Sequence, residues 1–358
     1  MNALSLFANV GFGELYLKDL GVNVVVANEL LEDRVEFYSE LHPDTKMICG
    51  DITNQFVKDQ IINTCLFDPI DGVDLIIATP PCQGMSKANA IKKEDDPRNC
   101  LIAHAMDIFN DLLPDYMLIE NVPDMTRTYI SVDKTPVKIL EYIESRLPKP
   151  YKLRYEILDA KYYNTPQSRK RFIGLISRDG EWKHPEPSNE LITVRDAIGW
   201  LPSLESGDGS LYPWHYAKNH NKNHIEWMKN TPTGDTAFNN KDNFPKKDGR
   251  VISGFKTTYK RMNWDKPAPT VTMTNGSVSS QNNVHPGDKK EDGTYSDARV
   301  LSVMEVAILC GLPEDYLNKF FNSKYKEGFF RRVLGECFPP TMAKEIVKNI
   351  PSIKSLDK

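Results

Sequence analysis

The stretch "VDLIIATPPCQGMS", residues 73–86, begins as an apolar run and ends as a polar loop that carries a cysteine. A short apolar run that is closed by prolines is typical of a buried β-strand. Similar apolar runs recur up to about residue 177 and alternate with stretches of helical spacing. These β-branched runs are "ALSLF", "VNVVVANE", "DYMLIENV", "YEILDA" and "RFIGLIS". This alternation predicts an α/β fold with a doubly wound, mostly parallel sheet.

A helix is expected between two of these runs, in "NCLIAHAMDIFNDLL" at residues 99–113. Its apolar residues recur at helical spacing, and Pro114 follows the last of them. A helix in this position reads as a crossover that covers one face of the sheet.

The texture changes near residue 183, where "KHPEPSNE" opens a stretch rich in proline, glycine, asparagine and lysine. Between residues 215 and 265 this stretch holds ten lysines and arginines against five acids. Helical order returns after residue 298, where Ser302 and Glu305 have the spacing of a capping box. We therefore predict a catalytic and cofactor-binding domain at 1–182, a smaller irregular domain at 183–298, and a C-terminal return to the first domain at 299–358.

A nucleotide site is indicated at the end of the first run, "SLFANVGFGE", where a glycine-containing turn leads toward an expected helix, "ELYLKDLG". Glu29 ends the next strand, where a carboxylate can accept from ribose hydroxyls, and Asp51 follows the third. Neither a GxGxxG nor a P-loop pattern is present, so no phosphate cradle is provided. The pattern favours a nucleoside without phosphates, and S-adenosylmethionine fits that description.

Cys82 admits three interpretations: a buried structural thiol, a metal ligand or a nucleophile. The six cysteines show no CxxC pair, which speaks against zinc and against a disulfide framework. Cys82 follows a central strand, in the loop where doubly wound sheets bind their ligands. Glu120 and Asn121 end the next run, and Arg169 and Arg171 enter another, so a thiol, an acid and cations are expected at one edge of the sheet.

With these residues in view, the chain resembles the DNA (cytosine-5)-methyltransferase family over nearly its whole length. The blocks that carry the resemblance occur in the family's order: "LFANVGFG", "ANE", "GDI", "PPCQGMS", "DDPRN", "IENV", "QSRKR", "RVLSVMEVAILCGLP" and "GECFPPTMAKEI". The resemblance implies the Rossmann-like sheet of S-adenosylmethionine-dependent methyltransferases, and it places a target-recognition domain in the basic region at 183–298.

The resemblance also implies the site residues. Cys82 would add to C6 of a flipped cytosine, Glu120 would bind N3, and Arg169 and Arg171 would hold O2. The implied cofactor-binding residues are Phe7, Asn9, Gly11, Gly13, Glu29, Asp51, Ile52, Pro80, Asn99 and Glu336. The implied DNA-binding residues are Gln83, Ser86, Lys87, Arg98, Gln167, Lys256, Lys260 and Arg261.

The chain departs from the family pattern at a few positions. Ser5 stands where the family usually has Asp, and Asn9 stands where it usually has Gly. Near the C-terminus, Glu336 replaces the usual Asn, and Cys310 and Leu312 replace a Gln-x-Phe pattern.

Composition sets the expected partners and location. The 358 residues are 40% hydrophobic, with a net charge of -4 and a pI of about 6.0, so only local patches can bind nucleic acid. We see no membrane segment or signal peptide, and we expect a cytoplasmic, nucleoid-associated monomer in a bacterial or phage-infected cell. Double-stranded DNA is the expected partner, with a separate restriction endonuclease as a possible companion. No metal is expected, because the spacing of His215, His220 and His224 matches no metal motif.

Two alternative functions stay open at this point. A tRNA cytosine-5 methyltransferase of the same fold would share the catalytic blocks, although the long variable region favours DNA. A catalytically inactive DNA-binding paralogue is the second alternative, and the presence of Cys82, Glu120, Arg169 and Arg171 argues against it.

Overall fold

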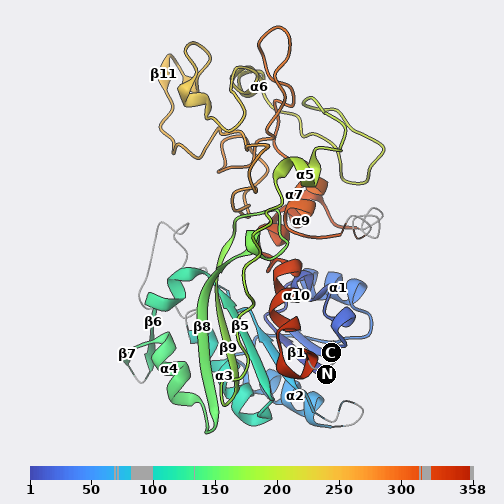
Figure 1. Ribbon diagram of the computed structural model, residues 1–358, viewed down its shortest axis with the longest axis vertical. Coiled ribbons are helices and arrows are strands. Elements are labelled where there is room, and N and C mark those ends of the chain that lie inside the picture. The colour runs from blue at the N-terminus through green and yellow to red at the C-terminus, as the bar shows by residue number, and fades with distance from the viewer. Residues whose placement is uncertain are drawn as a thin grey trace. The chain divides into compact units, whose positions relative to one another are not determined.

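The computed structural model describes residues 1–67, 70, 72–81, 100–132, 134–313, 316 and 324–354. These residues form two compact units (Figure 1). The first unit contains residues 1–159, 170–186 and 342–358, and the second contains residues 160–169 and 187–341. These boundaries differ from the predicted segments, because 160–169 and 299–341 both fall in the second unit.

A seven-stranded sheet in the order β3-β2-β1-β4-β5-β9-β8 forms the centre of the first unit. Strands β1 to β5 pair in parallel, whereas β9 is antiparallel to both β5 and β8. The strands are β1 (Asn2–Leu6), β2 (Asn23–Glu29), β3 (Lys46–Cys49), β4 (Leu75–Ala78), β5 (Tyr116–Asn121), β8 (Tyr151–Asp159) and β9 (Lys170–Arg178). The predicted doubly wound, mostly parallel sheet is confirmed.

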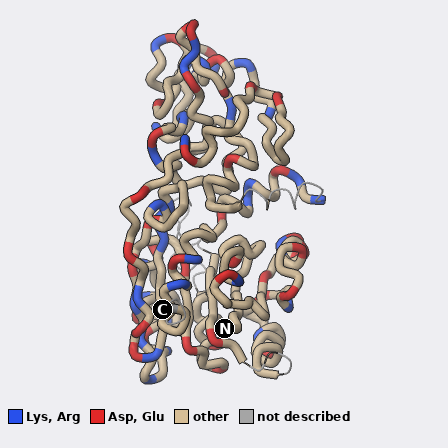
Figure 2. Tube along the Cα trace, turned by 45° about the vertical axis from the view of Figure 1, so that its right-hand side comes forward, with Lys and Arg blue, Asp and Glu red and all other residues tan. Residues whose placement is uncertain are grey.

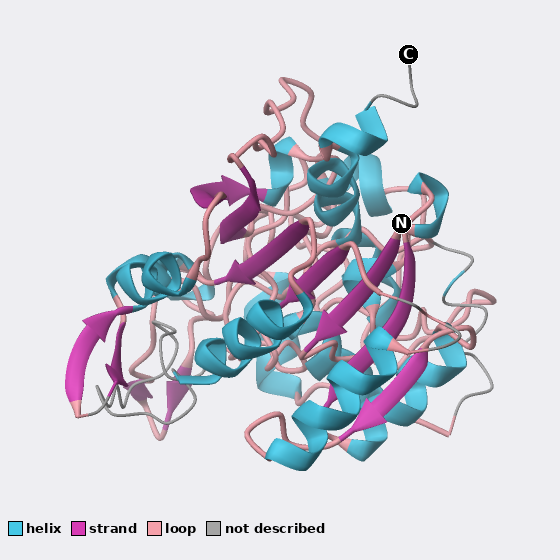
Figure 3. Cartoon of the chain, turned by 90° about the horizontal axis from the view of Figure 1, so that it is seen from below, coloured by secondary structure: helices cyan, strands magenta, loops and turns pink. Residues whose placement is uncertain are grey.

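Helices lie on both sides of the row of strands (Figure 3). The helices of this unit are α1 (Glu32–Leu41), α2 (Gln55–Leu66), α3 (Leu101–Leu112), α4 (Ile139–Arg146), α10 (Pro340–Lys348) and α11 (Pro351–Lys354). A short hairpin of β6 (Tyr129–Val132) and β7 (Thr135–Lys138) precedes α4, and the 3-10 turn η4 (Pro123–Arg127) follows β5.

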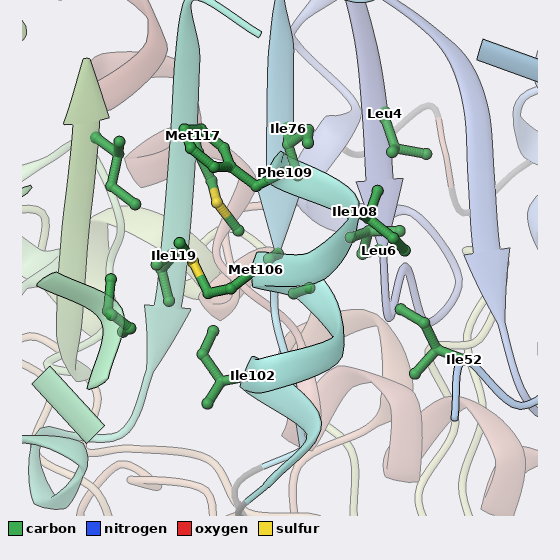
Figure 4. Packing of buried hydrophobic residues seen from close by; sticks show 14 of the residues in the cluster. Leu4, Leu6, Ile52, Ile76, Ile102, Met106, Ile108, Phe109, Met117 and Ile119 are labelled. Atoms are coloured by element: carbon green, nitrogen blue, oxygen red, sulfur yellow. The ribbon is translucent and has the colours of Figure 1, made fainter. Parts of the chain in front are cut away.

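Helix α3 is the crossover that the sequence predicts, and it begins two residues later than expected. Its apolar face, including Ile102, Met106 and Phe109, packs on Ile76 of β4 and Met117 of β5 (Figure 4). These side chains are all buried, and each contributes roughly 1.5 to 3 kcal/mol of transfer free energy. The core therefore fixes β4 and β5 side by side, which positions the loops that follow them.

The helix expected in "ELYLKDLG" does not form. Two 3-10 turns occupy this stretch instead, η1 (Phe12–Glu14) and η2 (Lys18–Leu20), with bonds from residue i to i+3. Gly11 and Gly21, which flank it, both have left-handed backbone angles, with φ of 75° and 71°. These left-handed residues bound the segment at both ends, and its backbone closes as two separate 3-10 turns.

The second unit contains little regular structure. Its elements are the 3-10 turns η5 (Ala160–Tyr162) and η6 (Ala237–Asn239), the helices α5 (Val194–Ile198), α6 (Lys222–Lys229), α7 (Val303–Leu309) and α9 (Glu327–Glu336), and the two-residue strands β10 (Lys246–Lys247) and β11 (Arg250–Val251). Helix α7 begins with the predicted capping box, in which Ser302 and Glu305 bond each other's backbone N–H.

A buried ion network anchors α7 to the irregular chain of this unit. Arg299 donates to both carboxylate oxygens of Glu305, at 2.8 and 2.9 Å, and to Asp297 at 2.8 Å. Arg299, Asp297 and Glu305 are at most 1% exposed. His285 lies beside the two acids, and its Nδ1 accepts from the backbone N–H of Gly287 at 3.1 Å. Because Arg299 bonds Glu305, residues 299–309 belong with the second unit.

The histidines that could have suggested a metal each have their own protein partners. His215 bonds Ser210, the ring of His220 accepts from the N–H of Val300, and His224 packs on Trp227. Among the described residues, no cluster of three potential metal ligands occurs. None of the helices in the described ranges combines the length and apolar character that a bilayer crossing requires.

The buried network predicts acid sensitivity. Burial lowers the pKa of His285 to about 4, and the nearby Arg299 charge acts in the same direction. Below pH 6.5 the unfolded chain therefore binds a proton that the folded chain does not, so stability falls as the pH falls from 6.5 to 4. Burial alone would raise the pKa of Asp297, but His285 and Arg299 lower it to about 2. The free energy of unfolding should therefore continue to fall as the pH falls below 4.

We expect His285 alone to cost about 3 kcal/mol of unfolding free energy between pH 6.5 and pH 4. Urea unfolding at a series of pH values measures this slope. His285→Asn keeps an acceptor for Gly287 but removes the titration, so its stability should vary less over this range. An identical pH slope in the variant and the parent would contradict the assignment.

Candidate active site

The strand order reverses between β1 and β4, which both pair in parallel and lie next to each other. In doubly wound sheets, ligands bind at the carboxyl ends of the strands at such a reversal. Thr79, just after β4, donates its hydroxyl to the carbonyl of Phe7 after β1 at 3.0 Å. Asn121, at the end of β5, donates to the carbonyl of Pro80 at 3.0 Å. Three strand ends are therefore held together by direct hydrogen bonds.

The loop after β1 has a tightly wound backbone. Phe7, Asn9 and Gly11 all have positive φ, at 58°, 51° and 75°. At Gly11 a Cβ would lie 2.5 Å from Nε2 of His42, and that nitrogen donates to the Gly11 carbonyl at 3.0 Å. Only glycine fits at position 11, because any side chain would displace His42 and strain the backbone.

Glu29 organises this loop from the end of β2. One carboxylate oxygen accepts from the N–H of Asn9 at 2.9 Å, and the other accepts from the N–H of Leu31 at 3.2 Å. A carboxylate oxygen has two lone pairs, so Glu29 can still accept from hydroxyls of a bound ribose. The predicted cofactor residues Phe7, Asn9, Gly11, Glu29 and Pro80 thus belong to one connected edge of the first unit.

A buried carboxylate that the sequence analysis missed lies beneath this loop. Glu14 accepts from the Ser5 hydroxyl at 2.5 Å and from the Tyr38 hydroxyl. Burial raises the pKa of Glu14, although His42 and the bond from Ser5 act against this shift. Ser5, one of the departures from the family pattern, thus has a buried carboxylate as its partner. The departure at Ser5 was the signal that could have revealed Glu14.

The other predicted cofactor residues are more dispersed. Asp51 is exposed and accepts from the N–H of Thr53 at 2.9 Å, whereas Ile52 is buried in the core. Gly13 lies within η1. Glu336 is the last residue of α9 in the second unit, and its role toward the cofactor stays a prediction.

Glu120 and Arg171 form an ion pair at the end of β5. Arg171 lies at the start of β9, which pairs with β5, and its Nε lies 2.7 Å from Oε1 of Glu120. Each side chain is 11% exposed, so the pair is largely shielded from solvent. An arginine at this distance fixes the orientation of the carboxylate.

Arg169 and Gln167 are buried and bonded to the backbone, and the roles predicted for them stay predictions. Arg169 is 2% exposed and donates to the carbonyls of Val271 at 3.0 Å and Gly335 at 2.9 Å. Gln167 is fully buried, and its amide bonds the backbone of Leu309 and Val271. Both terminal nitrogens of Arg169 therefore donate to backbone carbonyls, whereas Arg171 bonds Glu120.

Arg261, predicted as a DNA-binding residue, is a buried side chain in this structure, and its contact with DNA stays a prediction. It is fully buried and donates to four backbone carbonyls, those of Met228, His285, Ser296 and Asp297. Burial lowers its pKa to about 10. Lys256 is exposed and Lys260 is half-buried, so their predicted contacts with DNA stay predictions.

Cys82 lies outside the described residues, and so do Gln83, Ser86, Lys87, Arg98 and Asn99. The described chain reaches Pro81, the residue directly before Cys82. Asn121 bonds the carbonyl of Pro80, so the side chain next to Glu120 fixes the backbone that leads to the cysteine.

Comparisons with known proteins show the family to which the chain belongs. The family described as C-5 cytosine-specific DNA methylase matches residues 1–352. The chain is 41% identical to the type II methyltransferase M1.HgaI of Avibacterium volantium over 97% of each chain. It is 30% identical to the type II methyltransferase M1.HphI of Haemophilus parahaemolyticus, over 97% of this chain and 86% of the relative.

Two solved structures share the fold. A putative DNA modification methyltransferase encoded within an E. coli prophage has a TM-score of 0.70 at 19% identity, over 99% of both chains. The Dnmt2 methyltransferase of S. pombe has a TM-score of 0.62 at 16% identity, over 100% of this chain and 99% of the other.

The geometry at Glu29 predicts a loss of cofactor affinity on substitution. Glu29→Ala removes the acceptor for Asn9 and Leu31 together with the free lone pairs, so we expect S-adenosylmethionine to bind roughly 10- to 100-fold more weakly. Isothermal titration calorimetry measures this affinity. Glu32→Ala, which removes an exposed acid from the first turn of α1, is the matched control and should bind normally. Equal affinity in Glu29→Ala and the parent would refute the role of Glu29.

Proposed function

The chain belongs to the C-5 cytosine-specific DNA methylase family, and from that premise we propose how its residues methylate a cytosine within a specific double-stranded sequence. The enzyme is an S-adenosylmethionine-dependent DNA (cytosine-5)-methyltransferase. We propose that it flips the target cytosine out of the duplex, because C5 and C6 cannot be reached inside the stack.

One observation carries this proposal: the shielded Glu120–Arg171 pair stands beside the strand end that leads to Cys82. β4 and β5 are paired neighbours, and their carboxyl ends lie at the same edge of the sheet. An acid and a cation at the edge where the described chain leads toward Cys82 suit a planar base that must be held along its polar side.

Each proposed step has a residue that suits it. The Cys82 thiolate adds to C6, and the electron pair of the C5–C6 double bond moves to C5. C5 then takes the methyl group that S-adenosylmethionine supplies, leaving S-adenosylhomocysteine. The C5 proton departs to water, the double bond returns, and the Cys82 thiolate is expelled. The cysteine therefore ends the cycle as it began.

Glu120 and Arg171 stabilise the charge that this addition creates. Addition at C6 pushes electron density toward N3 and O2 of the ring. A Glu120 carboxyl that is hydrogen-bonded to N3 and the exocyclic amine stabilises it, and distinguishes cytosine from thymine. Arg171, which already orients Glu120, has a guanidinium able to approach O2. Preorganised donors of this kind contribute roughly 10²- to 10³-fold to a rate.

We assign recognition of the DNA sequence to the second unit, whose exposed loops carry many lysines and arginines. Figure 2 shows basic and acidic residues interspersed along the loops of the chain. The type II names of the relatives support a cytoplasmic enzyme that protects DNA from a separate endonuclease. We propose that the enzyme acts as a monomer.

Methyl transfer should depend on one thiol. With tritiated S-adenosylmethionine and duplex DNA, Cys82→Ser should lose all detectable methylation, because a hydroxyl is a far weaker nucleophile. Cys49→Ser, at an exposed cysteine, is the control and should retain activity. A tRNA transcript tested in parallel discriminates the RNA alternative. Activity in Cys82→Ser, or methylation of tRNA in preference to DNA, would contradict the proposal.

Substitutions of the two arginines in "QSRKR", Arg169 and Arg171, should have different effects on catalysis and on stability. Arg171→Lys should slow single-turnover methylation by about 10²-fold or more, because lysine lacks the planar guanidinium, while thermal stability changes little because a cation still faces Glu120. Arg169→Ala should destabilise the protein by roughly 3 kcal/mol, because two buried carbonyls lose their donors. Rapid-quench kinetics and thermal unfolding separate the two effects. A stable Arg169→Ala enzyme with a slow chemical step would reverse the assignment.

A further inference from the structure

A small basic hairpin projects from the second unit. β10 and β11 pair antiparallel, with Lys246 opposite Val251 and Lys247 opposite Arg250. Asp248 and Gly249 form the turn, and both have positive φ, at 51° and 76°. Two consecutive left-handed residues in a two-residue loop define a type I′ turn, for which Asp-Gly is a favoured sequence. The hairpin is therefore a built structure with a fixed tip.

The base of this hairpin is anchored while its tip is open. The N–H of Ile252 donates to the carbonyl of Pro245 at 3.0 Å, which closes the base. Ile252 packs against the small core of Trp227, Met228 and Tyr259. Residues 246–251 are all exposed. The tip is thus held out from a rigid support, as a recognition element must be.

The charges on the tip oppose each other. Lys247 and Arg250 are directly across from one another, and like charges in this position destabilise a free hairpin. In the described part of the chain, neither side chain has an ion-pair partner. The turn at 289–295 differs: its Lys290 is paired with Glu205 at 2.9 Å, and Glu291 and Asp292 follow. The hairpin at 246–250 thus carries three basic residues against the single acid Asp248, a charge that is complementary to the DNA backbone.

We propose that this hairpin enters the major groove of the target DNA, where Arg250 reads a guanine and Lys247 binds a phosphate. A two-stranded ribbon fits the major groove, and arginine is the side chain most often paired with guanine O6 and N7. Lys247 and Arg250 form one cross-strand pair, so their side chains leave the same face of the ribbon. The inference rests on the proposed function and adds the residues that select the sequence.

The test uses the full-length enzyme and the duplex site that bisulfite sequencing finds in DNA from expressing cells. Arg250→Ala should relax the preference at one base pair by about 5- to 150-fold. Lys247→Ala should weaken binding to all sequences and reduce the slope of log affinity against log salt by about 1. Lys289→Ala, an exposed lysine in the same unit, is the control and should change neither quantity.

The outcomes separate this inference from the proposed function. Thermal stability should not fall in any of the three variants, because the side chains are exposed and removing Lys247 or Arg250 relieves their repulsion. If the Lys247→Ala, Arg250→Ala double variant keeps the parent's affinity, salt slope and site preference, the hairpin assignment is wrong. Wild-type methylation of duplex DNA would still support the proposed function in that case. An affinity loss without any change in base preference would overturn the reading role of Arg250.

Discussion

The parallel pairing of β1 with β4 is the constraint on which the first unit depends. Because β1, β4 and β5 point the same way, the loops after them emerge at one edge. Two side-chain bonds, from Thr79 to Phe7 and from Asn121 to Pro80, then join these loops. The cofactor loop, the backbone before Cys82 and the acid Glu120 are positioned together, so one change in strand order would separate all three.

Buried arginines hold the loops of the second unit together by donating hydrogen bonds to their backbone carbonyls. Few of its backbone carbonyls are in helices or ladders, and a buried carbonyl still needs a donor. Arg261 donates to four carbonyls, Arg169 to two, and Arg331 to those of Asn275 and Leu301. These guanidinium groups link loops that are far apart in sequence. The basic residues of the second unit therefore serve two purposes. Buried ones such as Arg261 bind backbone carbonyls, and only exposed ones such as Lys256 are accessible to DNA.

The sequence predicts the features that local patterns determine. The strands, the helix at residues 101–112 and the capping box of Ser302 and Glu305 follow from apolar spacing and from side chains a few residues apart. It does not reveal that Arg169, Gln167 and Arg261 are buried, because their partners lie from 24 to 166 residues away. It also does not separate Arg171, which reaches Glu120, from Arg169, although the two differ by only two positions. Glu14 was missed for a similar reason, since its partner Tyr38 lies on another element.

The central claim is that Cys82 attacks a flipped cytosine whose polar edge is held by Glu120 and Arg171. Duplex DNA in which the target cytosine carries fluorine at C5 tests it most directly, because the step that releases the enzyme requires loss of a proton from C5. After incubation with S-adenosylmethionine, peptide mass spectrometry of the trapped complex should place the nucleotide on Cys82. An adduct on Cys49 or Cys100, or an active enzyme that forms no adduct, would contradict the account.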